Sequence, residues 1–244
     1  MECRLCNVEK GKLCKAHLIP ESFYRFMYPS NNVEGDALRV VLHDVDYVKK
    51  SRIGLYDDSL LCASCDQILG RLDEYGKDIL LTSIPKILNT GNDIFILTNV
   101  DINKLITFFL SVLWRCSISK RPETRDVSIG AKFEGKIRRL LYQDNGSLDD
   151  FAVVISRYNY LNDNYKKMVI LPTYLKMDGI NFYYVYFPNG YKVLIKVDSR
   201  PQPPQLNSLT LTAGNPAYVV KAGYFEATLE YIKTSTKVKS INFR

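Results

Sequence analysis

This chain of 244 residues is poor in histidine and in long apolar runs. His17 and His43 are its only histidines, so imidazole chemistry is restricted to these two positions. The longest apolar stretch, LITFFLSVLW at 105–114, is shorter than the roughly 20 residues that span a bilayer and is closed by Arg115. The first residues, MECRLCNVEK, are charged and hold two cysteines, which argues against a secretory signal peptide. We therefore expect a cytoplasmic protein with no membrane contact.

Charged residues are distributed unevenly along the chain, although its overall composition is ordinary for a globular protein. Residues 1–75 hold 10 Lys and Arg against 12 Asp and Glu, whereas residues 76–244 hold 23 against 14. The basic residues of the chain cluster at 48–52, 119–125, 136–139 and 164–167. Such clusters can contact phosphates, and some of the 17 tyrosines could stack on bases, although solvated surfaces have the same composition.

The sequence pattern divides the chain into a module rich in turns and cysteine at 1–75 and a basic α+β domain at 76–244. One helix is expected to begin near Cys65 and to run toward Pro85. No internal repeat or low-complexity tract interrupts either part.

Helices dominate the first half of the second domain, at about 101–143. A strongly apolar helix is predicted at 101–119 with Asp101 as its N-cap, and an amphipathic helix at 131–143. From 151 to 244 the pattern is β-rich, with a hairpin turn at Pro188-Asn189-Gly190. We predict an α+β fold in which a zinc module is followed by helices and then by an antiparallel sheet.

Four of the six cysteines form two pairs with CxxC spacing, Cys3 with Cys6 and Cys62 with Cys65. Each spacing brings two thiolates onto one tight turn, and four thiolates fill the tetrahedral shell of Zn²⁺. The second pair leads directly into the predicted helix, which is the treble-clef arrangement of zinc knuckles. We therefore predict a structural zinc site, with Cys14 as an accessory ligand or a bystander and Cys116 in the core.

The sequence resembles the HNH endonuclease superfamily in these cysteine pairs and in two segments, AHLIP at 16–20 and DDSLLCASCD at 57–66. The ββα-metal site of that superfamily is built on a treble clef. The chain is particularly similar to bacterial HNH-like proteins with the order CxxC…HxxP…CxxC[ND]…D, over roughly its first third. Many of them occur in prokaryotic antiphage or mobile-element contexts. The resemblance implies a metal-dependent nuclease that prefers DNA to RNA, with a partner protein of a defence system.

The resemblance also implies roles for individual residues. His17 matches the general base that activates water, and Asp57 matches the residue that orients this base. Asp66 and Asp73 lie two turns apart on the predicted helix and would hold a catalytic Mg²⁺ or Mn²⁺. The sequence departs from the family at Ala16, where a metal ligand is common, and at Asp66, where His or Asn is more usual.

Structural alternatives stand beside each of these roles. His17 could be a zinc ligand or a buried histidine, and Asp66 could serve only the helix dipole. Asp73 could lie on a solvated face, and Asp57 could be a turn former. His43 is expected on a strand, with a structural role favoured over a role in the site. The alternative function is a non-catalytic, zinc-stabilised adaptor or sensor that binds nucleic acid or protein.

Overall fold

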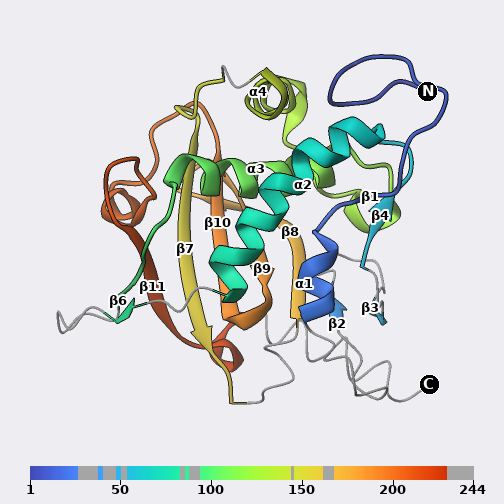
Figure 1. The fold of residues 1–244 in the computed structure, drawn as a ribbon. Helices are drawn as coiled ribbons and strands as arrows, with labels where there is room; N and C mark the ends of the chain where they lie inside the picture. The colour runs from blue at the N-terminus through green and yellow to red at the C-terminus, as the bar shows by residue number, and fades with distance from the viewer. Residues whose placement is uncertain are drawn as a thin grey trace.

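The computed structural model describes residues 1–26, 38–40, 48–50, 54–82, 86–87, 94–143, 146–161 and 168–229. The fold is mixed α+β, as predicted. Helices α2 and α3 cross one face of a large sheet, and α4 lies beyond one end of its strands (Figure 1). The N-terminal segment with α1 flanks these helices on the side away from β11 (Figure 1).

The three predicted helices are confirmed. The helices are α1 (Glu21–Phe26), α2 (Ala63–Lys77), α3 (Ile102–Ile118) and α4 (Gly130–Gln143), and a π-helical turn (Asp78–Thr82) continues α2. Asp101 caps α3, because its carboxylate accepts a hydrogen bond from the backbone N–H of Lys104 at 3.0 Å. None of the helices within the described ranges combines the length and the apolar character needed to cross a membrane.

Within the described residues, a sheet of nine strands forms the other layer, in the order β3-β2-β8-β9-β10-β7-β11-β6-β5. Its strands are β2 (Leu38–Val40), β3 (Val48–Lys50), β5 (Lys86–Ile87), β6 (Ile94–Leu97), β7 (Phe151–Asn159), β8 (Met168–Met177), β9 (Ile180–Phe187), β10 (Tyr191–Val197) and β11 (Ala217–Tyr224). The expected hairpin joins β9 to β10, where Asn189 and Gly190 adopt φ angles of 64° and 83°.

The observed sheet differs in two respects from the antiparallel sheet predicted at 151–244. β11 pairs in parallel with β7, and β2 pairs in parallel with β8. Four strands, β2, β3, β5 and β6, also come from the chain before residue 100. Parallel neighbours require crossover connections between distant segments, which a local sequence pattern does not report.

The larger of two clusters of buried apolar side chains among the described residues spans both parts of the chain. It extends from Cys3 and Leu5 through α3 to Val219 on β11. The predicted boundary after residue 75 falls inside α2, so a division at that point does not separate two cores. A separate two-stranded sheet, β1 (Ala16–His17) with β4 (Tyr56–Asp57), lies beside these helices.

Gly76 allows α2 to approach α3 closely. A Cβ atom at this position would lie 2.5 Å from Cδ1 of Phe108, whereas a Cβ at Gly70 on the same helix would meet nothing within 4 Å. We expect Gly76→Ala to lower the free energy of unfolding by about 1–3 kcal/mol through overpacking. The matched variant Gly70→Ala should raise it by up to about 1 kcal/mol, because alanine favours the helix. Urea denaturation measures both, and equal effects would contradict this packing.

Candidate metal centre and active-site cavity

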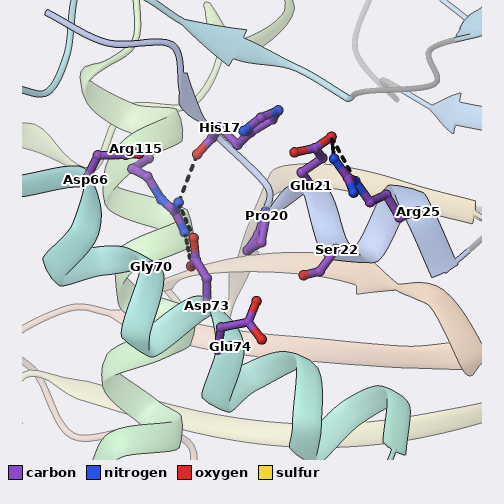
Figure 2. Close-up of a pocket in the computed structure, with 10 residues that line it drawn as sticks. All are labelled: His17, Pro20, Glu21, Ser22, Arg25, Asp66, Gly70, Asp73, Glu74 and Arg115. Carbon is purple, nitrogen blue, oxygen red and sulfur yellow. Dashed lines mark hydrogen bonds and ion pairs between the residues drawn. The ribbon is translucent and has the colours of Figure 1, made fainter. Parts of the chain in front are cut away.

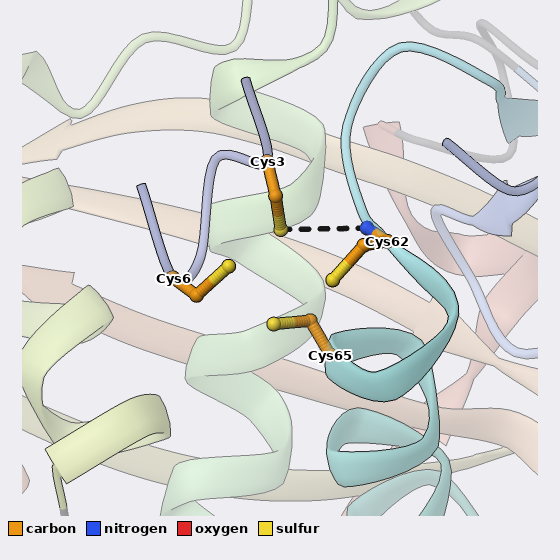
Figure 3. A group of neighbouring side chains, drawn as sticks. All are labelled: Cys3, Cys6, Cys62 and Cys65. Atoms are coloured by element: carbon orange, nitrogen blue, oxygen red, sulfur yellow. Dashed lines mark hydrogen bonds between the residues drawn. The ribbon is translucent and has the colours of Figure 1, made fainter. Parts of the chain in front are cut away.

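Four cysteine thiols converge at the N-terminal end of α2. Cys3 and Cys6 lie on a turn closed by a hydrogen bond from Cys3 N to Val8 O at 3.1 Å, and Cys62 and Cys65 lie at the start of the helix. Their Sγ atoms all lie within 4.8 Å of one another (Figure 3). Zn–S bonds of about 2.3 Å place the sulfurs of a tetrahedral site about 3.8 Å apart. The four thiols therefore fit a zinc ion, and no second group of this kind occurs within the described ranges.

The electrostatics of the cluster favour a bound cation. Burial raises the pKa of Cys65 and of Cys6, so their thiolates are unfavourable without a compensating charge. Burial acts the same way on Cys62, but hydrogen bonds from Ser64 and from the Cys65 N–H outweigh it and lower the Cys62 pKa to about 6. The Cys62 N–H also donates to Sγ of Cys3 at 3.4 Å, a contact that orients the sulfur. Metal binding would release the remaining thiol protons.

The other two cysteines lie outside the cluster. The Cys14 thiol donates to Leu61 O at 3.2 Å, and burial raises its pKa to about 11. Cys116 is completely buried in α3, and burial raises its pKa to about 12. Cys14 is therefore not a ligand in this arrangement, and Cys116 has the predicted core position.

We expect the purified protein to contain one zinc per chain, measured by inductively coupled plasma mass spectrometry. Cys65→Ser should lose the metal and unfold at a much lower denaturant concentration, because metal binding and folding are coupled. Cys14→Ser provides the matched control and should retain both zinc and stability. Loss of zinc from both variants, or from neither, would contradict the four-cysteine site.

A polar cavity of about 280 Å³ lies between β1, α1, α2 and α3. Figure 2 shows its lining, which consists of His17, Pro20, Glu21, Ser22, Arg25, Asp66, Gly70, Asp73, Glu74 and Arg115. The structure thus brings together three of the four predicted catalytic residues. Gly70 leaves the space between the two aspartates open, since nothing lies within 4 Å of its Cβ position.

The His17 ring has an atom available for chemistry. Its Nε2 is buried and has no hydrogen-bond partner among the described residues, and its ring packs edge-on against Tyr56 with centroids 6.2 Å apart. Asp66 lies on the same cavity, where burial raises its pKa and the positive charge of Arg115 opposes this effect. The cysteine cluster does not include His17, so nothing supports the alternative in which His17 binds the zinc.

Asp57 does not lie where it could orient His17. In the β1–β4 pair, Ala16 is opposite Asp57 and His17 is opposite Tyr56. Opposite residues of an antiparallel pair share a face, and successive residues alternate between faces. The Asp57 side chain therefore projects from the face opposite to His17, and its predicted role requires correction.

The carboxylate of Asp57 instead binds serine residues. It accepts hydrogen bonds from Ser59 N at 2.9 Å, from Ser59 Oγ at 2.6 Å and from Ser119 Oγ at 2.7 Å. Burial disfavours its ionisation, but these hydrogen bonds outweigh burial and hold the pKa of Asp57 below its usual value. Asp57 thus holds the segment after α3 against β4, which is a structural role.

Asp73 is bound by an arginine that the sequence analysis assigned only to the end of an apolar run. Arg115 Nη1 donates to Asp73 Oδ2 at 2.9 Å, and Nη2 donates to Oδ1 at 2.6 Å. Nη1 also donates to the backbone carbonyl of His17 at 2.9 Å (Figure 2). Both oxygens of Asp73 are thereby engaged, so its prediction as a free metal ligand is not supported. The sequence signal for Arg115 was a charged residue directly after the apolar run at 105–114.

Removal of the Asp73 carboxylate should leave a buried, unpaired guanidinium, because the Arg115 side chain is only 1% exposed. We expect Asp73→Ala to lower the free energy of unfolding by about 3 kcal/mol or more. The neighbouring variant Glu74→Ala, at a side chain that is 64% exposed, should change it by less than about 1 kcal/mol. Chemical denaturation measures both variants, and a small effect of Asp73→Ala would show that Arg115 finds another partner.

The predicted basic clusters are partly used within the protein. In 119–125, Arg121 Nε donates to Tyr56 O at 2.8 Å. In 136–139, Lys136 pairs with Asp150, and Arg138 Nη1 donates to Leu5 O at 3.1 Å. Cluster 164–167 and residues 51–52 of the first cluster lie outside the described residues, as does His43.

Comparisons with protein-family models, with curated proteins and with solved structures find no match to this chain. The candidate site is therefore assigned from its own geometry and from the local motifs.

Proposed function

We propose that this protein is a zinc-stabilised, metal-dependent nuclease of HNH type that hydrolyses phosphodiester bonds, with DNA favoured as the substrate. The main observation in support of this proposal is His17 Nε2, which is buried, has no hydrogen-bond partner among the described residues and lies at a polar cavity shared with Asp66. The cysteine turn, the β1–β4 pair and the helix that begins at the second cysteine pair support a treble-clef frame around this cavity.

His17 has the role of general base in this proposal. A neutral imidazole with a free Nε2 accepts a proton from a water molecule that attacks the phosphorus. The backbone of His17 is held by Arg115, and its ring by contact with Tyr56, so the imidazole is oriented before substrate binds. Preorganisation of this kind lowers the cost of reaching the reactive geometry.

Asp66 is the carboxylate of α2 at this cavity that remains for a catalytic ion, because Asp73 binds Arg115 and Glu74 pairs with Lys77. Mg²⁺ is usually held by one or two carboxylates together with substrate phosphates and water, so a complete protein cage is not required. Such an ion would neutralise charge on the scissile phosphate and on the leaving oxygen. The motif resemblance further supports an effector role in prokaryotic antiviral defence, with a partner protein that delivers the substrate.

The second candidate function is a non-catalytic, zinc-stabilised adaptor that binds nucleic acid or protein. Two observations favour it: Ala16, at a position where the family often has a metal ligand, is completely buried, and both oxygens of Asp73 are occupied. The adaptor retains the cysteine site and the fold but has no hydrolytic activity.

Nicking of supercoiled plasmid with Mg²⁺ or Mn²⁺, with labelled RNA in parallel, distinguishes the two functions. We expect His17→Ala to reduce cleavage at least 100-fold at equal zinc content, as removal of a general base does. Glu21→Ala provides the control, because Glu21 lines the same cavity but pairs with Arg25. Equal cleavage by wild type and His17→Ala would refute the assignment of His17, and no cleavage of either substrate would favour the adaptor.

A further inference from the structure

A second polar recess, of about 440 Å³, opens where the chain leaves β7. It is lined by Phe95, Arg157, Tyr158, Asn159, Tyr160, Asn189 and Tyr224, which come from β6, β7, the β9–β10 turn and β11. In Figure 1 this end of β7 lies on the opposite side of the molecule from β1. None of these residues belongs to the His17 cavity or to the cysteine cluster.

Arg157 provides fixed hydrogen-bond donors in this recess. Its Nε donates to Asn189 O at 3.1 Å, and its guanidinium carbon lies 5.3 Å from the ring centroid of Tyr191. Within the described part of the chain, Nη1 and Nη2 have no hydrogen-bond partner. Lys221 lies opposite Arg157 in the β11–β7 pair but does not line the recess, so Arg157 is the basic residue of the lining. A guanidinium held in this way is suited to bind a phosphate.

Aromatic rings and amides complete the lining. Tyr224 is 49% exposed, which leaves its ring accessible for stacking. The Tyr160 ring packs against the ring of Phe225, with centroids 5.5 Å apart. Asn159 is exposed and carries both a donor and an acceptor, which is the combination that reads the edge of a base.

We propose that this recess binds a nucleotide unit, with the base against Tyr224 and Tyr160 and the phosphate at Arg157. Its volume lies within the range of about 300–1,000 Å³ that is typical of ligand pockets. Stacked aromatic rings beside a basic group are the recurring means of holding single-stranded nucleic acid. Glu226 Oε1 accepts a hydrogen bond from the Leu161 N–H at 3.0 Å, and this carboxylate would repel a phosphate, so the phosphate belongs at Arg157. The proposal does not require cleavage at His17.

Fluorescence anisotropy with the zinc-loaded protein of 244 residues tests this site in the absence of Mg²⁺. The probes are a labelled 12-nucleotide oligothymidylate and its oligouridylate counterpart, with AMP, TMP and inorganic phosphate as unlabelled competitors. We expect Tyr224→Ala and Arg157→Gln each to weaken probe binding by about tenfold. Asn159→Ala should weaken it less, because a single amide contact is lost.

Tyr142→Ala is the matched control, because Tyr142 is similarly exposed, at 44%, but lies on α4. It should leave the affinity unchanged, and so should His17→Ala, which separates this site from the proposed cleavage. Competition by AMP or TMP but not by phosphate identifies a free nucleotide as the ligand, whereas binding of the oligonucleotides alone identifies a strand. Equal affinity for all variants, no binding of either probe, or equal competition by phosphate would overturn the proposal. Tyr224→Ala keeps the test valid if Arg157→Gln fails to fold.

Discussion

The buried guanidinium of Arg115 is the constraint on which the arrangement around His17 depends. A charge that is almost fully removed from water is costly unless each donor finds an acceptor. Here the acceptors come from three elements: the Asp73 carboxylate on α2, the His17 carbonyl on β1 and Ser111 on α3 itself. The requirement to satisfy one cation thus brings together segments that are 42 and 98 residues apart in sequence.

Helix α2 connects this constraint to the rest of the molecule. Two of the clustered cysteines and Asp66 lie at its N-terminal end, Asp73 lies two turns further along, and Gly76 near its C-terminal end packs against α3. A shift of the helix would alter the metal centre, the cavity and the core together. A metal ion held by the four cysteines would therefore also fix where Asp66 lies relative to His17.

The two polar recesses are supported in different ways. The His17 cavity is formed between helices and a short strand, and an ion pair holds its walls. The recess at Arg157 is formed at the end of sheet strands, where backbone pairing holds its side chains. Binding at the Arg157 recess and hydrolysis at the His17 cavity, as proposed, would suit a protein that binds a strand at a distance from the bond it cleaves.

The sequence by itself determined the elements whose causes are local. The CxxC spacings predicted the cysteine site, Asp101 predicted the start of α3, and Asn189-Gly190 predicted the hairpin, because each depends on a few adjacent residues. Only the tertiary structure decided the parallel pairing of β2 with β8 and of β11 with β7. It also decided the direction of the Asp57 side chain and the partner of Asp73. Strand register assigns the face of a side chain, and the burial of Arg115 selects its acceptors. Both arise from contacts between distant segments, which local periodicity does not encode.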